Sequence, residues 1–280
     1  MTTPTPADWI GRSRTATDPM HPWAANALIA TLELDRPALG PGDALPPFWH
    51  WLHFLEARPR SELGADGHPA TGGFMPAVRQ PRRMWAGGRV AFHDPLPLGA
   101  PATRRSTIAD VAEKTGRAGE MTFVTVRHEI AGRAGLAVVE EQDIVYRFDP
   151  ADDDAPRPAP REAPAGEAAR RDWSCGPVEL FRYSALTFNG HRIHYDADHA
   201  RATEGYPGLV VHGPLLATLL LDLAGAMAGD GAIRRFSFRA LAPVFAGEPF
   251  SACGLPTDGG LALWIRAGDG RLAMEASVGL

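Results

Sequence analysis

Cysteine and lysine are scarce in this chain of 280 residues: the two cysteines are Cys175 and Cys253, and Lys114 is the single lysine. Two cysteines are too few for a disulfide framework or a thiolate metal site, so we expect neither, and we expect a reducing, cytoplasmic compartment. Arginine supplies the remaining basic charge, yet the formal net charge is −5. That balance argues against a nucleic-acid-binding surface.

Long hydrophobic segments and nucleotide-binding motifs are also missing. The longest apolar run, residues 215–228, contains Asp222 and is too short to cross a bilayer. The first residues lack the basic flank and apolar core of a secretory signal, so we expect none. No Walker A motif, GxSxG elbow, dinucleotide fingerprint or CxxC pair occurs, which leaves ATP-dependent, serine-hydrolase, nicotinamide-dependent and zinc-finger functions without support.

Hydrophobic residues make up 45% of the chain, enough for a sizeable core in one large domain or two ordinary ones. Apolar spacing and aromatic content predict short helices at residues 7–14, 23–34 and 48–57. Residues 58–81 are rich in glycine, proline and polar side chains, which is typical of a long loop that covers a site. Strands are predicted at residues 83–93, 103–114, 121–131 and 136–148, with hairpin turns at 116–119 and 131–135.

Residues 149–170 are the clearest linker, because their proline, alanine and charge content offers little to bury. The second half then follows the plan of the first, with an apolar helix at residues 215–228 before strands at 232–242, 248–254, 260–267 and 271–278. Each half is thus predicted to contain a helix followed by an antiparallel sheet. This repetition indicates an α+β chain of two fused units. We place the units at residues 1–150 and 171–280, with the linker at 151–170.

The densest chemistry lies in residues 179–216, where Asn189, His194 and Asp196 fall within eight positions. Further on, His212 and Gly213 open the apolar helix. A helix start offers unpaired N–H groups and a partial positive charge to an oxygen that becomes negative during reaction. Glycine also lets another group approach the backbone closely. We therefore expect the active site in this stretch.

The segment LTFNGHRIHYD, with Tyr183 before it and His212-Gly213 after it, resembles the hydratase-2 or MaoC-like motif. The similarity is greatest to the branch of mesaconyl-CoA and itaconyl-CoA hydratases and mitochondrial type-2 3-hydroxyacyl-thioester dehydratases, which PRRMWAGGRVAF in the first half also resembles. The chain departs from the broader pattern at Asn189, where an aspartate would stand. The resemblance implies a double hot-dog fold, in which two fused units each wrap an antiparallel sheet around a central helix.

A hydratase must handle the proton of water and stabilise the negative charge that develops on the thioester oxygen. His194 is the expected proton handler, because imidazole titrates near neutral pH. The Gly213 N–H is the expected oxyanion donor. Asn189 exchanges no proton at neutral pH, so we assign it the orientation of water. Asp196 either steers the His194 tautomer or caps a helix that begins near residue 197.

Substrate contacts are expected from both halves, with the first half supplying a wall of the site. We call residues 179–216 the catalytic segment. The candidates are Tyr183, Arg192 and His212 in this segment, and Arg82, Arg83, Trp85, Gly87 and Gly88 in the first half. Small residues let a pantetheine arm pass close to the backbone, and an arginine can pair with a free carboxylate. The structural alternatives are a buried tyrosine, solvated arginines and a glycine-rich turn.

The remaining histidines are interpreted conservatively. His50 and His53 are read as packing or hydrogen-bonded side chains. His191 and His199 in the catalytic segment lack a compact HxxxH or HExxH frame, so no metal is expected. CoA is part of the substrate, so no separate cofactor is expected either.

The sequence therefore predicts a hydro-lyase, an acyl-CoA hydratase or dehydratase that acts on a short branched or dicarboxylic enoyl-CoA of the mesaconyl-CoA or itaconyl-CoA type. One alternative is a fatty-acid-type 3-hydroxyacyl-thioester dehydratase. Another is a non-catalytic acyl-thioester-binding protein. Asn189, which stands in place of an aspartate, is the reason for this second alternative. A homodimer of fused units is compatible with the sequence, whereas no nucleic-acid or membrane partner is expected.

Overall fold

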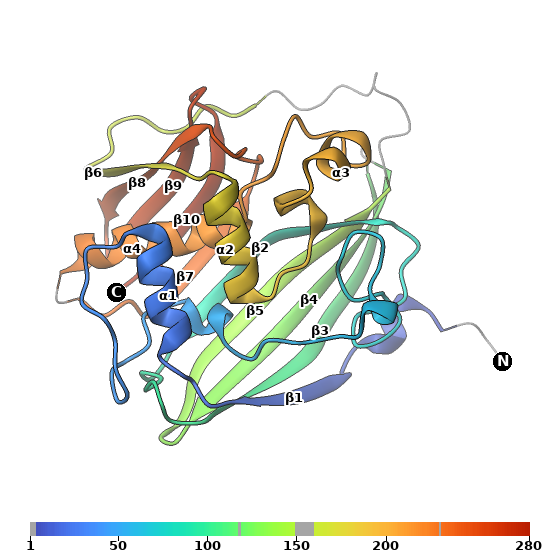
Figure 1. Cartoon of the computed structure of the whole chain (residues 1–280), viewed down its shortest axis with the longest axis horizontal. Helices are drawn as coiled ribbons and strands as arrows, with labels where there is room; N and C mark the ends of the chain where they lie inside the picture. The colour runs from blue at the N-terminus through green and yellow to red at the C-terminus, as the bar shows by residue number, and fades with distance from the viewer. Residues whose placement is uncertain (1–3, 117–118, 149–159, 230) are drawn as a thin grey trace.

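One antiparallel sheet organises the chain. The computed structural model describes residues 4–116, 119–148, 160–229 and 231–280. These residues form a ten-stranded sheet in the order β1-β3-β4-β5-β2-β7-β10-β9-β8-β6, and the pairing of β2 with β7 joins the strands of the first half to those of the second. Helices α1, α2 and α4 lie on one face of this sheet (Figure 1).

The predicted strands are present, with shifts of a few residues at their ends. The first half contributes β1 (Ser13–Asp18), β2 (Arg82–Phe92), β3 (Ala102–Gly116), β4 (Gly119–Gly132) and β5 (Gly135–Arg147). The second half contributes β6 (Ala169–Ser174), β7 (Arg235–Ala240), β8 (Pro249–Thr257), β9 (Gly260–Ala267) and β10 (Leu272–Gly279). Gly132 pairs with Gly135 across the predicted β4–β5 turn. Residues 117–118 of the other predicted turn lie outside the described residues.

The helices are α1 (Trp23–Leu32), α2 (Pro177–Thr187), α3 (Ala197–Ala202) and α4 (Gly213–Ala228). Two predicted helices are wrong. Residues 7–14 form one 3-10 turn, Pro6–Trp9, and then enter β1, because pairing with β3 satisfies their backbone groups. Residues 48–57 keep only the turn Trp49–Leu52, since Phe48 and Phe54 flank it in the left-handed conformation, with φ of 73° and 58°.

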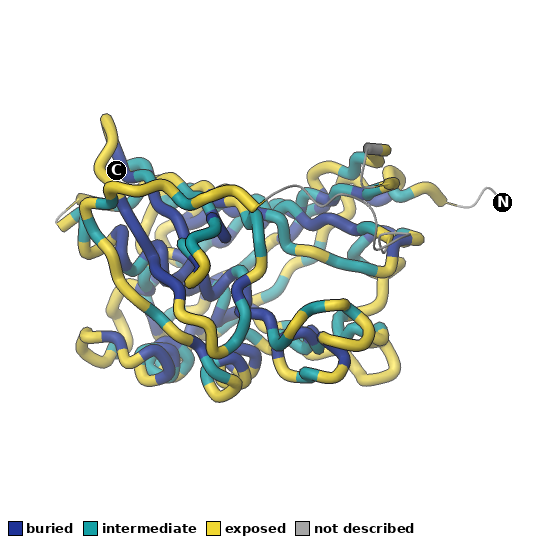
Figure 2. Tube along the Cα trace, turned by 90° about the horizontal axis from the view of Figure 1, so that it is seen from above, coloured by how far each residue is buried: buried dark blue, intermediate teal, exposed yellow. Residues whose placement is uncertain are grey.

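The apolar helix α4 is the core of the second half. Its contacts run to β6, β8, β9 and β10, so these strands curve around it. Ten of its 16 residues are buried, among them Leu215, Leu219 and Leu220. Buried stretches of the chain gather on the side that carries the C-terminus (Figure 2). In a helix packed this way, the burial of leucine side chains supplies most of the stability.

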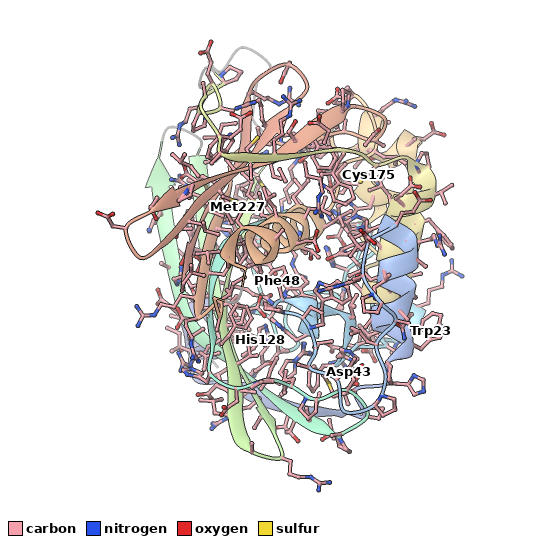
Figure 3. All side chains as sticks on the ribbon, turned by 90° about the vertical axis from the view of Figure 1, so that its left-hand side faces the viewer. Trp23, Asp43, Phe48, His128, Cys175 and Met227 are labelled. Carbon is pink, nitrogen blue, oxygen red and sulfur yellow. The ribbon has the colours of Figure 1, made fainter. Side chains whose placement is uncertain are left out.

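The first half repeats the sheet but has no helix of comparable length. Its helix α1 spans ten residues and packs beside α2. Trp23, at the start of α1, points outward, and Phe48 lies toward the interior near α4 (Figure 3). This leaves much of the inner face of β3, β4 and β5 free to line a cavity.

The predicted linker is only partly described. Its residues 149–159 lie outside the described residues, and its last two residues already belong to β6. The unit boundaries at residues 150 and 171 therefore stay a prediction. No helix among the described residues has the length and apolarity needed to cross a membrane.

Candidate active site

His194 lies in a short 3-10 turn between α2 and α3 and is buried. Its Nδ1 donates a hydrogen bond to the carbonyl of Val210 at 2.7 Å, which leaves the lone pair of the neutral ring on Nε2. Burial lowers the pKa of His194 to about 4, although the Val210 carbonyl opposes the shift. The imidazole is therefore neutral at pH 7 and can accept a proton through Nε2.

His212 supports His194 from the start of α4. The two rings stack at 3.7 Å between centroids, and His212 Nε2 hydrogen-bonds Ser184 Oγ at 2.8 Å. The His212 side chain is fully buried, and its Nδ1 has no hydrogen-bond partner among the described residues. The buried Tyr183 ring lies 4.9 Å from it. These contacts pack His212 between His194, Ser184 and Tyr183, and its predicted contact with substrate stays a prediction.

Asn189 ends the turn that follows α2. Its Oδ1 accepts the backbone N–H of His191 at 3.0 Å, while its Nδ2 has no partner among the described residues. His191 in turn meets His194 edge-on at 5.5 Å. Burial, His194 and Arg83 together lower the pKa of His191 to about 3. Asn189 therefore presents an uncommitted N–H₂ group next to a pair of neutral imidazoles.

Gly213 is the first residue of α4, where an N–H has no intrahelical acceptor. Trp85 of β2 packs over it, so that a Cβ at Gly213 would lie 2.7 Å from Trp85 Cε3. Glycine at this position thus lets a side chain of the first half reach the helix start. Asp196 caps α3 by accepting the N–H of His199 at 2.9 Å, which confirms the capping role considered for it.

A cavity of about 490 Å³ opens beside Asn189, whereas His194 and Gly213 are not among the residues that line it. Asn189, Tyr183 and Pro214 line it from the second half. The inner face of the first half adds Arg83, Arg104, His128, Glu140 and Gln142, and the predicted covering loop adds Glu62, His68, Phe74 and Met75. The loop at residues 58–81 therefore lines the cavity beside Asn189, and its role in covering an active site stays a prediction.

The deep end of this cavity holds a buried carboxylate. Glu140 accepts hydrogen bonds from His50 Nε2 and Trp51 Nε1, both at 2.8 Å. Burial opposes ionisation of Glu140, but His50 and its other neighbours outweigh burial and lower its pKa. His53 Nδ1 likewise bonds Asp18 at 3.0 Å. The interpretation of both histidines as hydrogen-bonded side chains is confirmed.

The arginines predicted to contact substrate lie in different settings. Arg82 binds the backbone carbonyl and the side chain of Glu204, and Arg192 binds Asp196 and the carbonyl of Ala65. Arg83 lines the cavity and makes no hydrogen bond or ion pair with any of the described residues. Among these three arginines, Arg83 is the one that presents its guanidinium to a ligand in the cavity.

Gly87 and Gly88 lie where the two halves of the sheet join. A Cβ on Gly87 would overlap the carbonyl of Phe238 in β7, and one on Gly88 would lie 2.8 Å from the Phe238 ring. The close approach of β2 to β7 is a structural reason for both glycines. Their predicted contact with substrate stays a prediction.

Asp66, His68 and His191 form a group whose ligand atoms all lie within 4.8 Å of one another, which suits a metal ion. Two features of this group disfavour a metal ion there. Asp66 Oδ1 already accepts the N–H of His68 at 3.0 Å, and the positive charge of Arg83 acts on both imidazoles. A cation would have to overcome that charge.

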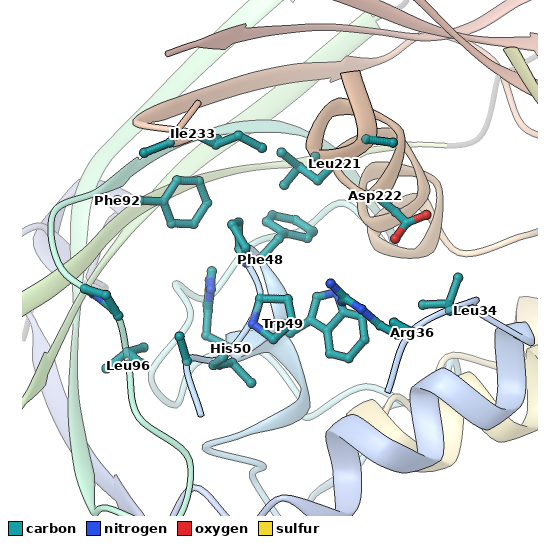
Figure 4. A pocket seen from close by; sticks show the side chains of 18 of the residues that line it. Leu34, Arg36, Phe48, Trp49, His50, Phe92, Leu96, Leu221, Asp222 and Ile233 are labelled. Carbon is teal, nitrogen blue, oxygen red and sulfur yellow. The ribbon is translucent and has the colours of Figure 1, made fainter. Parts of the chain in front are cut away.

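A second cavity, of about 890 Å³, lies at the other end of α4 (Figure 4). Phe48, Leu221 and Ile233 line it, and Arg36 stacks on Trp49 at 5.1 Å. None of the residues predicted to be catalytic or to bind substrate lines this cavity. Asn189, Tyr183 and Arg83 thus line the smaller of these two cavities.

Residues 48–246 match the family model of hydroxyacyl-thioester dehydratase type 2. The chain belongs to this family. The mesaconyl-C(4)-CoA hydratase of Chloroflexus aurantiacus is 45% identical over 275 residues, which cover 97% of this chain and 96% of that protein. The mitochondrial hydroxyacyl-thioester dehydratase type 2 of Schizosaccharomyces pombe is 29% identical over 253 residues, 79% of this chain and 80% of that one. These relatives confirm the predicted family and the predicted class of enzyme.

Solved structures confirm the fold of this type 2 dehydratase family member. A MaoC-like dehydratase from Phytophthora capsici superposes with a TM-score of 0.75 at 13% identity, over 98% of this chain and 97% of that one. A Mycobacterium tuberculosis protein described as having a double hotdog fold superposes with a TM-score of 0.60 at 16% identity, over 96% and 95% of the two chains.

Sequence reasoning missed the first-half side chains that complete the cavity. His68, Arg104 and Glu140 were not singled out, because each lies in a segment with no motif. The prediction that residues 58–81 cover a site was the one signal that could have led to His68.

Proposed function

We propose that this protein is a hydratase that adds water reversibly to an enoyl-CoA thioester whose short acyl group carries a free carboxylate, of the mesaconyl-CoA or itaconyl-CoA type. The observation that supports it most directly is the neutral, buried His194, whose Nε2 has its lone pair available. The name of the Chloroflexus aurantiacus relative supports the choice of substrate.

In this mechanism His194 Nε2 accepts a proton from water while the water oxygen bonds to the β-carbon of the substrate. The electron pair of the double bond moves toward the thioester, and the Gly213 N–H binds the thioester oxygen as it becomes negative. Protonated His194 then returns its proton to the α-carbon, which restores the neutral imidazole. Asn189 holds the water, through its free Nδ2 or the second lone pair of Oδ1.

Charged side chains in the cavity wall support a carboxylated acyl group over a long hydrocarbon chain. Arg83 lacks an anionic partner among the described residues and can form charge-assisted hydrogen bonds with a carboxylate. Arg104 and Glu140 add charge to the same walls, which would make burial of an alkyl chain unfavourable. The alternative, a fatty-acid-type dehydratase, requires an apolar acyl cavity.

The test follows the absorbance of the conjugated enoyl-thioester with mesaconyl-CoA, itaconyl-CoA, crotonyl-CoA and a medium-chain enoyl-CoA. We expect turnover of the carboxylated substrates and a loss of about 10²–10⁴-fold in the His194→Ala variant. The exposed His21→Ala variant is the matched control and should retain full activity. Turnover confined to the medium-chain substrate would favour the fatty-acid-type dehydratase, and binding without turnover would favour the non-catalytic binder.

We further propose that the enzyme works in the cytoplasm as a homodimer, with no cofactor besides the CoA of its substrate. Strands β1 and β6 end the sheet and each pairs on one side among the described residues, which leaves edges that a second copy can use. Sedimentation of the purified protein would reveal a monomer if this assembly is wrong.

A further inference from the structure

The covering loop, residues 58–81, packs against the catalytic segment where two glycines meet. A Cβ on Gly67 would overlap the carbonyl oxygen of Gly190, and a Cβ on Gly190 would lie 2.8 Å from the carbonyl oxygen of Gly67. Gly67 also has a φ of +89°, which side chains disfavour. Gly190 directly follows Asn189, so the loop is seated against the active site itself.

Hydrogen bonds hold this contact, which we call the latch segment, residues 64–68. The N–H of Arg192 donates to the carbonyl of Asp66 at 2.9 Å, and its guanidinium donates to the carbonyl of Ala65 at 3.1 Å. Within the segment, the N–H of Gly64 donates to the carbonyl of His68 at 2.7 Å. The latch segment is therefore a closed turn whose position depends on the catalytic segment.

The latch segment carries His68 into the cavity. The His68 ring lies 4.6 Å from the ring of His191, which itself meets His194 at 5.5 Å. His68 and Arg83 line the same cavity as Asn189, and the ring nitrogens of His68 make no hydrogen bond with the described residues. Burial lowers the pKa of His68 well below its usual value, and the charge of Arg83 lowers it further. A neutral imidazole and an unpaired guanidinium thus share one wall.

We propose that the latch segment is part of the substrate-binding wall, and that His68 acts with Arg83 as a specificity-determining residue that binds the free carboxylate of the acyl group. This inference rests on the proposed hydratase function. Arg83 offers a planar fork of donors, and His68 offers one further N–H. Together they satisfy an anion that neither Asn189 nor His194 can neutralise.

The first experiment compares kcat/KM for mesaconyl-CoA and for crotonyl-CoA, which lacks the carboxylate. In His68→Ala we expect roughly a 10–100-fold loss with mesaconyl-CoA, the usual effect of removing a hydrogen bond to a charged group, and a much smaller loss with crotonyl-CoA. His68→Asn retains an N–H donor and should regain part of the preference. Equal losses with both substrates, or no loss with mesaconyl-CoA, would overturn the proposal.

A second pair of variants tests the latch without touching the imidazole. Gly67→Ala should lose the same preference for mesaconyl-CoA, because the added Cβ pushes the segment off Gly190. Gly72→Ala is the matched control. Gly72 lies in the same loop with a φ of +93°, but its added Cβ would meet only Ala77 Cβ at 3.8 Å, so the preference should remain. An unchanged preference in a folded Gly67→Ala protein would contradict the role of the latch.

Failure of this inference and failure of the proposed function give different results. If the unaltered protein hydrates none of the four enoyl-CoA substrates of the first panel, the proposed hydratase is wrong. If it hydrates crotonyl-CoA as well as mesaconyl-CoA, and His68→Ala changes neither rate, the hydratase stands and the carboxylate site at His68 and Arg83 is wrong.

Discussion

The two halves of the sheet use their inner faces differently. In the second half, Phe236, Phe250 and Ile265 join the leucines of α4 in one apolar core. In the first half, Arg104, His128 and Glu140 face the cavity instead. A charged inner face is costly to bury unless its groups are paired or serve a ligand. The comparison indicates that the second half carries most of the apolar core around α4, while the first half places charged side chains on the cavity wall.

Acidification should produce the largest loss of stability, and buried histidines in both halves contribute to it. Burial lowers the pKa of His128 and His194 to about 4 and, with nearby positive charges, that of His191 to about 3. An unfolded chain protonates these side chains near pH 6.5. Stability is therefore complete above about pH 6.5 and falls as the pH drops toward 4, by up to about 1.4 kcal/mol per pH unit for each histidine.

Urea unfolding at a series of pH values measures this slope. His128→Gln removes the contribution of the first half, and His191→Gln removes one contribution from the second half. Each variant should therefore lower the slope of the free energy of unfolding against pH by the equivalent of about one proton. A stability that does not change between pH 6.5 and 4.5 would contradict the neutral state of these histidines.

Truncation of a side chain should give the next largest loss of stability, and the loss should differ between the two halves. Leu219→Ala in α4 should lower the free energy of unfolding by about 2–5 kcal/mol, because the fully buried side chain leaves a cavity. Gln142→Ala, on the cavity wall of the first half, loses a hydrogen bond to His128 and should cost only about 1 kcal/mol. Chemical denaturation of both variants tests the difference, and equal losses would mean that the two faces share the scaffold role.

The contact between the halves should change stability less than truncation of Leu219 does. Gly213→Ala places a methyl group 2.7 Å from Trp85 Cε3, so the helix start or the indole must shift, at about 1–3 kcal/mol. Adding Trp85→Leu should recover stability, since the smaller side chain makes room. If the double variant is no more stable than Gly213→Ala, the cost does not arise from this contact.

Local patterns explain why much of this protein was predictable. Strand-like composition and turn residues located eight of the ten strands to within a few residues, but not β1 or β6, and the apolar run located α4. The same patterns failed at residues 48–57, where aromatic content indicated a helix. Phe48 and Phe54 adopt left-handed conformations there, which no sequence pattern signalled.

The sequence by itself determined eight of the ten strands, the apolar helix and the candidate catalytic segment around His194, because each depends on residues close together in the chain. Only the tertiary structure decided which first-half groups reach that segment. The contact of the latch segment with Arg192 joins residues 127 positions apart, and the packing of Trp85 on Gly213 likewise crosses from one half to the other. Such contacts follow from the pairing of β2 with β7, which brings the halves together and has no local signature.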